Sequence, residues 1–494
     1  MENLIFEKSQ PGRKGYQLPA LDVPSIDPAS VLPKASIRKR LAELPEMSEL
    51  DVVRHYTRLS QLNFSIDTNF YPLGSCTMKY NPKVNEQIAN LTGFKAIHPL
   101  QPTATVQGFL QVYYELERIL SEMCGMAEFT LQPSAGAHGE LTGLLIARAY
   151  HKYKGNPRKT VIIPDSAHGT NPASAMIAGY QVVNVKSDAR GGVDLASLKA
   201  ALNQDTAVFM LTNPSTLGLF EKQMKEIAKM VHDVGALLYL DGANMNALVG
   251  LVRPGDLGFD IMHLNLHKTF STPHGGGGPA AGPVGVTQAL TPFLPVPRVR
   301  KTEQGYSLEE SAPLSIGKMR AFNGNSLILL RAYTYIRCLG REGVRKNTEI
   351  AILNANYLRV KLQDAYQVAI DEPCMHECIF TAAKQKPKGV KTLDIAKRML
   401  DYGYHPPTIY FPLIVEEAMM IEPTETESKQ TLDAFIETMH VIAKEAENDP
   451  EKLKHAPYTT PVRRLDEVKA AREPNLRWKP TESTAGDPVA NRHA

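Results

Sequence analysis

Between Phe70 and Gly324 the chain alternates short apolar runs with amphipathic helical patterns. The apolar run 207–211 is followed by a second one at 236–241, and the residues between them that recur at helical spacing are Met224, Ile227, Ala228 and Val231. Runs that are apolar throughout indicate strands buried on both faces, and helices between such strands are typical of βαβ units. We therefore predict an α/β fold with a large, mostly parallel sheet.

The regions on either side of this pattern differ from it. The start of the chain mixes charges and prolines, and an apolar-rich helical pattern at Leu327–Leu339, ending near Gly340, leads into a second, smaller α/β region. The last residues, 483–494, are predicted to be disordered because they are polar and lack apolar runs. The predicted segments are an N-terminal arm (1–69), a large cofactor-binding domain (70–325), a small C-terminal domain (326–455) and a C-terminal extension (456–494).

Two residues that follow apolar runs have side chains that can take part in a reaction. Asp241 ends the run at 236–241, and Lys268 ends a later apolar segment in front of four glycines, Gly275–Gly278. Ligands bind at the edge where the carboxyl ends of parallel strands meet. A lysine at the mouth of a packed core can lose its proton by desolvation, and a Schiff base with an aldehyde requires that neutral amine. We therefore predict pyridoxal phosphate (PLP), with Lys268 holding the aldehyde and Asp241 keeping the ring nitrogen protonated.

A small-residue turn before a predicted helix is the candidate phosphate site. Ser134, Gly136 and Ala137 would let the backbone close on an anion, and the helix that follows would direct its free N–H groups at the oxygens. The same residues also fit a tight turn at a helix start that binds nothing. The glycines after Lys268 would admit close backbone approach or form a mobile flap.

Three further residues are candidates for contact with the cofactor. His168 lies in a polar loop after a predicted strand, where its ring can stack on the pyridine and move protons. Thr212, with Asn213 after it, is placed to contact the ring hydroxyl, and His267 precedes the lysine. Exposure or a structural hydrogen bond for His168, an ordinary Asn-Pro-Ser turn at 213–215 and simple packing of His267 are the competing interpretations.

Composition narrows the class of function. The 494 residues are 43% hydrophobic, with a formal charge of +3 that is too small and dispersed to favour nucleic acid or an anionic membrane. No apolar stretch is long enough for a membrane span, and residues 1–12 resemble neither a signal nor a transit peptide, so a cytoplasmic location is the default expectation. The five cysteines form no Cys-x-x-Cys pair, and packed cysteines are favoured over zinc at Cys374, His376 and Cys378, so no metal is predicted.

The order of these motifs resembles fold-type I PLP enzymes, the aspartate-aminotransferase-like group. A closer resemblance is to the P-protein of the glycine cleavage system, and it extends over most of residues 1–470. It is carried by four segments, namely 71–82 (YPLGSCTMKYNP), 136–140 (GAHGE), 168–175 (HGTNPASA) and 265–270 (NLHKTF). His138 stands where long P-proteins commonly carry Gln, which leaves the role of that side chain open.

The resemblance implies an activity and partners. The chain would decarboxylate glycine with PLP and transfer the aminomethyl group to the lipoyl arm of the H-protein. Because single-chain P-proteins are about twice as long, the chain resembles subunit 2 of the split form, which implies a separate subunit 1 and a heterotetramer. His168 or His267 would handle protons in the transfer, and Arg320 is a candidate to bind the glycine carboxylate. The alternatives are another fold-type I enzyme, such as an aminotransferase, aldolase or decarboxylase, or a non-catalytic scaffold subunit.

Overall fold

The computed structural model describes residues 2–39, 42, 44–274 and 280–478. It divides into two compact units, Met1–Ser65 with Thr460–Ala494, and Ile66–Thr459. The glycine run Gly275–Gly278 and the segment 483–494, on which two predictions were made, lie outside the described residues. The boundaries predicted at residues 70, 326 and 456 stay predictions.

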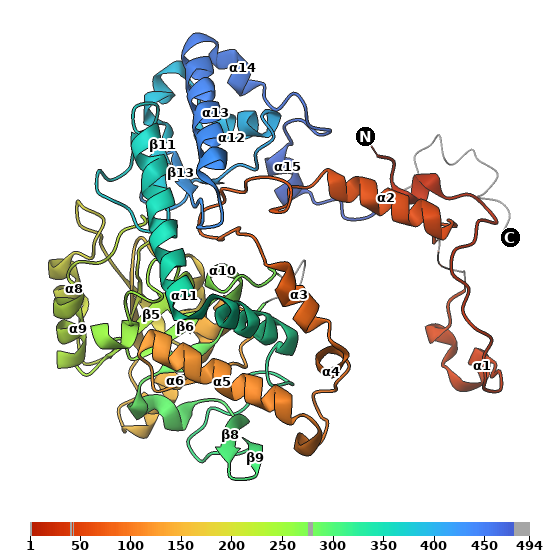
Figure 1. Ribbon diagram of the computed structural model, residues 1–494, viewed down its shortest axis with the longest axis horizontal. Helices are drawn as coiled ribbons and strands as arrows, with labels where there is room; N and C mark the ends of the chain where they lie inside the picture. The colour runs from red at the N-terminus through yellow and green to blue at the C-terminus, as the bar shows by residue number, and fades with distance from the viewer. Residues whose placement is uncertain (1, 40–41, 43, 275–279, 479–494) are drawn as a thin grey trace. The chain divides into compact units, whose positions relative to one another are not determined.

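The centre of the Ile66–Thr459 unit is a seven-stranded sheet in the order β1-β7-β6-β5-β4-β2-β3. Its middle strands β5 and β6 are labelled in Figure 1. Its strands are β1 (Glu128–Thr130), β2 (Thr160–Pro164), β3 (Gln181–Val185), β4 (Thr206–Thr212), β5 (Leu237–Gly242), β6 (Ile261–Leu264) and β7 (Val284–Val286). The neighbours β3, β2, β4, β5 and β6 are parallel, and β7 runs antiparallel to both of its neighbours, β6 and β1, so β1 has the same direction as the other five strands. The predicted large, mostly parallel sheet is confirmed.

Helices cover both faces of this sheet, which explains why its strands are apolar throughout. In β4, Phe209 and Leu211 pack into one core while Val208 and Met210 pack into another, because successive side chains of a strand point to opposite faces. One face is covered by α5 (Gln107–Cys124), α8 (Leu195–Ala201) and α9 (Met224–Asp233), and the other by α6 (Gly136–Tyr153) and α7 (Thr170–Ile177). The helices predicted after residues 136 and 224 are therefore confirmed.

A smaller antiparallel sheet lies in the C-terminal part of the same unit, in the order β10-β11-β13-β12. It comprises β10 (Gln367–Val368), β11 (Cys378–Thr381), β12 (Thr408–Ile409) and β13 (Ala418–Ile421), and packs with α12 (Thr392–Asp401), α13 (Lys429–Asn448) and α14 (Pro450–Lys454). Cys374 and Cys378 are buried in this core.

Helix α11 (Ser326–Leu362) contributes to the cores of both sheets. Leu329 and Tyr335 in its first half pack with the large sheet, and Ala355 and Leu358 in its second half pack with the small one. The prediction that the helical pattern 327–339 ends near Gly340 is confirmed, because Gly340 adopts the non-helical angles φ 63° and ψ −176° and separates two helical segments of α11. A helical pattern resumes beyond it because apolar residues again face a core.

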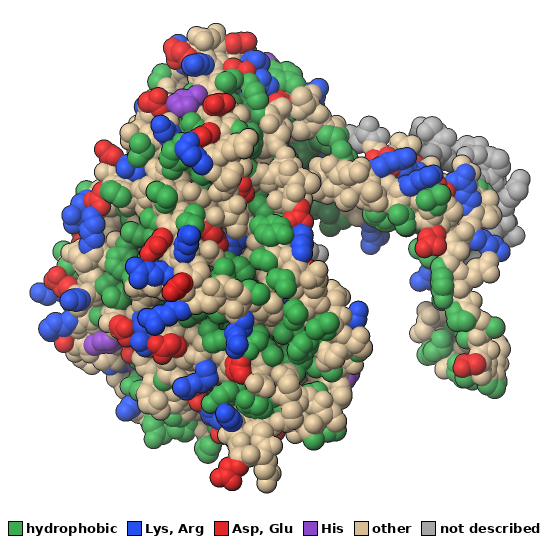
Figure 2. Space-filling view, viewed as in Figure 1, with side chains coloured by type: hydrophobic (Ala, Val, Ile, Leu, Met, Phe, Trp, Pro, Cys, Tyr) green, Lys and Arg blue, Asp and Glu red, His purple; other side chains and the backbone are tan. Residues whose placement is uncertain are grey.

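The remaining elements are short. They are α1 (Pro28–Val31), α2 (Glu49–Gln61) and α15 (Glu467–Arg472) in the first unit, and α3 (Lys83–Ala89), α4 (Thr92–Lys95), α10 (Leu266–Thr269), β8 (Arg298–Thr302) and β9 (Gly305–Glu309) in the second. Single 3₁₀ turns occur at Ile5–Lys8, Lys34–Ser36, Thr103–Thr105, Pro254–Leu257, Gln288–Phe293, Ala382–Lys384 and Lys386–Lys388. On the face shown in Figure 2, positive and negative side chains are interspersed. Among the described residues, no helix is both long and apolar enough to span a bilayer.

Candidate active site

The strand register collects the candidate residues at the carboxyl edge of the large sheet. Thr212 of β4 pairs with Asp241 of β5, and Asp241 pairs with His263 of β6. The chain leaves β6 at Leu264 and forms α10, a single helical turn that carries Lys268. A parallel sheet thus brings residues that are far apart in the sequence to one row.

Lys268 is half-buried, and its charge acts on groups from several directions. These groups are His263 in β6, His267 beside it, Cys76 in the 70–82 segment and Glu377 in front of β11. The lysine therefore lies where the carboxyl edge of the large sheet meets the 70–82 segment and the small sheet.

Asp241 is a buried anion with several partners. Asn171 Nδ2 donates to its Oδ2 at 2.9 Å, the backbone N–H of Ala243 donates to Oδ1 at 3.1 Å, and His263 Nε2 lies 3.2 Å from Oδ1. Burial alone would raise the pKa of Asp241, but the charge and the contacts of His263, together with the donors, outweigh burial and hold this pKa below its usual value. The carboxyl group is therefore ionised at neutral pH, as a partner for a protonated ring nitrogen must be.

The polar network continues behind Asp241. Burial lowers the pKa of His263, but Asp241 and then Glu140 raise it, and the net pKa lies above the usual value. Glu140 is itself buried and accepts hydrogen bonds from Thr170 Oγ1 at 2.7 Å and Ser174 Oγ at 2.9 Å. The His263 ring contacts Asp241 through Nε2 and the Tyr239 hydroxyl through Nδ1, at 3.2 Å each, and this network helps to fix the position of Asp241.

The phosphate turn is closely packed against the helix that carries the lysine. A Cβ atom on Gly136 would lie 1.9 Å from Asn265 Oδ1, and Asn265 is the N-cap of α10. Among the described residues, no side chain caps the first turn of α6, and the N–H groups of Gly136 and Ala137 are candidates to bind an anion. Ser134 differs, because its N–H donates to His138 Nδ1 at 3.2 Å.

His138 and Arg320 lie together at this turn. Burial lowers the pKa of His138, and the charge of Arg320 lowers it further. Arg320 also donates from Nη1 to Asn325 Oδ1 at 2.6 Å. A cation beside the phosphate turn suits an anion there, and the predicted contact of Arg320 with a substrate carboxylate stays a prediction.

His168 is exposed on the loop before α7. Its Nδ1 lies 2.9 Å from Thr170 Oγ1, and its ring packs edge-on against Phe411 with the centroids 5.7 Å apart. Thr170 in turn donates to Glu140. Through Thr170, His168 is therefore linked to Glu140 in the network behind Asp241, while the His168 ring is exposed. The stacking of this ring on the cofactor stays a prediction.

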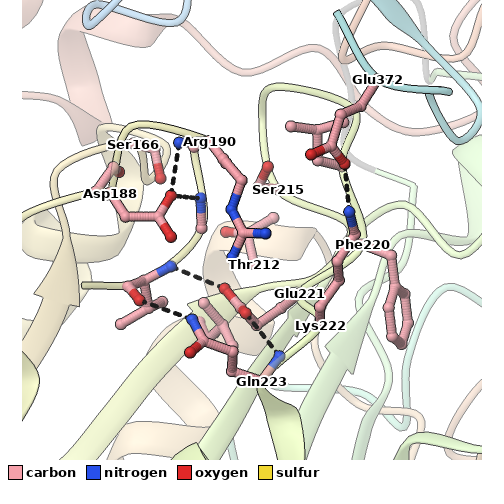
Figure 3. A pocket seen from close by; sticks show the side chains of 16 residues that line it. Ser166, Asp188, Arg190, Thr212, Ser215, Phe220, Glu221, Lys222, Gln223 and Glu372 are labelled. Carbon is pink, nitrogen blue, oxygen red and sulfur yellow. Dashed lines mark hydrogen bonds and ion pairs between the residues drawn. The ribbon is translucent and has the colours of Figure 1, made fainter. Parts of the chain in front are cut away.

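Thr212 lines a pocket beside the carboxyl edge, and Figure 3 shows it there with Ser166 and Ser215. Lys222 and Glu372 form an ion pair at this pocket, whose lining includes neither Lys268 nor Asp241. The Thr212 Oγ1 atom is buried and has no hydrogen-bond partner among the described residues. Strand register places Thr212 next to Asp241, but its side chain opens to the neighbouring pocket.

His267 is a neutral imidazole next to the lysine. Burial, followed by the charges of His274 and Lys268, lowers its pKa to about 3. Its ring centroid lies 4.6 Å from that of His274, whose Nε2 is 2.9 Å from the Cys76 carbonyl oxygen. With so low a pKa, His267 is a poor proton acceptor at neutral pH.

Sequence reasoning did not single out Asn171, His263 and Glu140, or the buried acids Glu377 and Glu422. A usable signal existed for His263, which is a polar residue inside the apolar strand 261–264. Glu377 and Glu422 carried no such signal, since only tertiary folding brings them near Lys268.

A buried polar atom without a hydrogen-bond partner helps to show whether the residues of this site fit PLP. Asn213 Nδ2 is buried with no partner among the described residues, while its Oδ1 accepts from the Glu221 N–H at 3.0 Å. That free donor follows β4 and suits the phenolic oxygen of the cofactor. With an ionised Asp241, a half-buried Lys268 and a closely packed turn at Gly136, the residues present fit PLP.

The sheet and this row of residues define a PLP-dependent enzyme of fold-type I. The Aminotransferase class-V family model matches residues 140–282, and the model described as glycine dehydrogenase, C-terminal domain, matches residues 347–459. A "probable glycine dehydrogenase (decarboxylating) subunit 2" of Caldanaerobacter subterraneus is 60% identical, covering 96% of this chain and 98% of that protein. A protein of the same name from Listeria monocytogenes is 57% identical with the same coverage. The chain belongs to the glycine dehydrogenase (decarboxylating) subunit 2 family, as the resemblance predicted.

Solved structures support the same fold. The crystal structure of an inhibitor-bound glycine decarboxylase, the P-protein of the glycine cleavage system, aligns with a TM-score of 0.71 at 22% identity, covering 84% of this chain and 94% of that one. A cysteine desulfurase from Thermococcus onnurineus aligns with a TM-score of 0.58 at 14% identity, covering 77% and 97%.

Proposed function

We propose that this chain is the PLP-carrying subunit that decarboxylates glycine and passes the remaining aminomethyl group to the lipoyl disulfide of the H-protein. The observation that carries the proposal is the near full-length identity to proteins named glycine dehydrogenase (decarboxylating) subunit 2. The row of Asp241, His263 and the Lys268 helix supplies the geometry that such a reaction requires.

PLP, when bound, supplies an electron-poor ring that accepts the electron pair of the bond between the glycine α-carbon and its carboxylate. Asp241 faces the ring nitrogen as an anion and keeps a proton on it. His263 and Asn171 hold that carboxylate in place. Lys268 is the residue whose amine would hold the cofactor aldehyde.

The other side chains set the charge and shape around the lysine. His267 is neutral at physiological pH and adds no positive charge next to the Lys268 amine. The N–H groups of Gly136 and Ala137 would bind the phosphate, and Asn213 Nδ2 would donate to the ring hydroxyl. His168 would cover the ring.

The partners follow from the family name. A subunit 2 implies a subunit 1, and we infer that the two assemble as a heterotetramer that docks the lipoylated H-protein. We place this assembly in the cytoplasm, where its partners would also be.

Exchange of labelled carbon dioxide into the carboxyl group of glycine tests the proposal. We expect exchange to rise sharply when subunit 1 and lipoylated H-protein are both added, and to vanish in Lys268→Ala. The matched control is Lys199→Ala, an exposed lysine on α8, which should behave as the wild type. Exchange that is indifferent to both partners would favour another fold-type I activity, and a chain that binds no PLP even with its partner would favour a scaffold.

A further inference from the structure

Glu377 and Glu422 form a second buried acidic pair near Lys268. Glu377 directly precedes β11 and Glu422 directly follows β13, and these two strands pair at that end. The two side chains are buried, with exposed fractions of 4% and 1%. A carboxylate oxygen from each and a ring nitrogen of His376 all lie within 4.8 Å of one another.

The two carboxyl groups differ in the number of donors that they have. Among the described residues, Glu377 accepts one hydrogen bond, from the Ser75 N–H at 3.0 Å. The donors to Glu422 are the Thr77 N–H at 3.2 Å, the Thr77 hydroxyl at 2.7 Å, Asn244 Nδ2 at 3.1 Å and Asn246 Nδ2 at 3.0 Å. Two like charges this close disfavour ionisation of the member with fewer donors. Glu377 is therefore the member that keeps the proton.

The titratable groups around Glu377 agree with this assignment. Burial, followed by the charge of Glu422, raises the pKa of Glu377 to about 8, with the Ser75 N–H and Lys268 acting in the opposite direction. His376, next to it in the sequence, has a pKa lowered by burial, and Cys76 from the 70–82 segment has a pKa raised by burial. Both are therefore neutral at physiological pH.

The proposed reaction needs a proton at one defined atom. The bond from the glycine α-carbon to its carboxylate breaks and carbon dioxide leaves, and the carbon then bonds to one sulfur of the lipoyl disulfide. The sulfur–sulfur bond breaks, and its electron pair stays on the second sulfur. The glycine carbon is thereby oxidised, the disulfide is reduced, and the second sulfur must take up a proton to become a thiol.

We propose that Glu377 donates this proton to the departing lipoyl sulfur and that Glu422 is the positioning residue that keeps Glu377 protonated. The inference rests on the proposed function. Its support is the burial of the pair, the unequal hydrogen bonding, and the electrostatic interaction of Glu377 with the Lys268 amine that marks the reacting centre. Glu377 regains its proton from solvent before the next turnover.

Transfer of the aminomethyl group to lipoylated H-protein, measured with subunit 1 present across a range of pH, tests the donor. Wild-type turnover should fall as the pH rises through about 8, because Glu377 then loses its proton. Glu377→Gln should load PLP normally, judged by its visible absorbance, yet transfer about 100-fold more slowly or worse, with no such fall. Glu377→Asp should recover part of the rate. The control Glu416→Gln changes an exposed glutamate of the same region and should match the wild type.

Stability of the cofactor-free protein supplies a readout independent of activity. Because the folded pKa of about 8 exceeds the ordinary 4.5, the folded state binds more protons between these values. The free energy of unfolding of the wild type should therefore fall relative to that of Glu377→Gln as the pH rises from 4.5 to 8. Equal pH dependence of the two proteins would contradict the protonated state of Glu377.

The outcomes separate the two proposals. A wild type that transfers nothing with both partners present contradicts the proposed function. If the wild type is active and Glu377→Gln has the same rate or the same pH profile, the role of Glu377 as proton donor is contradicted, but the proposed function is not. Loss of PLP absorbance in Glu377→Gln also overturns the donor, because the residue would then shape the cofactor site.

Discussion

At the residue scale, Gly136 lets the turn at 134–137, which is predicted to bind the phosphate, pack closely against α10, the helix that carries Lys268. A Cβ atom on Gly136 would overlap the side chain of Asn265, which caps α10 at its start. A side chain at residue 136 would therefore require the Asn265 side chain to move, next to the helical turn that carries Lys268.

Gly136→Ala should weaken PLP binding and lower the free energy of unfolding by about 1–3 kcal/mol, the usual cost of forcing an extra methyl group into a packed site. A PLP titration followed by visible absorbance and urea unfolding of the cofactor-free protein measure the two effects. Gly93→Ala is the control, because a Cβ there meets no atom within 4 Å. Unchanged PLP affinity in Gly136→Ala would show that the turn does not hold the phosphate.

Sequence patterns predict some of the site residues and miss others, because only some of them follow a recognisable apolar run. Asp241 and Lys268 each follow an apolar run, so strand periodicity alone predicts their place at the sheet edge. Glu377 and Glu422 flank short strands of a different sheet, and nothing local distinguishes them from exposed glutamates. For His168 the sequence left exposure and a cofactor contact both open, because the outcome depends on how the loop before α7 packs.

At the element scale, the strands were the most predictable part. Burial on both faces makes β4 and β5 apolar throughout, and such runs show directly in the sequence. In α11 the sequence indicates the end of a first helical segment at Gly340, and the structure has a non-helical residue there, but the second segment that follows directly was not predicted. A glycine shows that the helical geometry is interrupted, but only the two hydrophobic cores decide that a helix continues beyond it.

At the scale of the whole molecule, Lys79 links parts of the Ile66–Thr459 unit that meet at the site. Its buried Nζ donates to the Thr269 carbonyl oxygen of α10 at 2.8 Å, to Tyr335 of α11 at 3.3 Å and to Glu425 at 2.7 Å. Burial lowers its pKa, but Glu425 and Tyr335 outweigh burial and the net pKa is raised, so the lysine is charged. One ion pair thus ties the 70–82 segment to both sheet regions.

Lys79→Met should lower the free energy of unfolding by about 3–5 kcal/mol, because it leaves the buried Glu425 without its counter-charge. Adding Glu425→Gln should recover part of that loss, since the orphaned charge is then removed as well. Urea unfolding of the single and double variants gives both values. A single variant as stable as the wild type would show that this pair does not hold the regions together.

The most direct test of the account is where PLP attaches. Borohydride reduction of the PLP-loaded wild type, followed by proteolysis and mass spectrometry, should find the cofactor mass on the peptide that contains Lys268 and on no other lysine. Lys268→Ala treated in the same way should carry no such label. A label on a different lysine, or none on a wild type supplied with PLP and subunit 1, would contradict the site described for this chain.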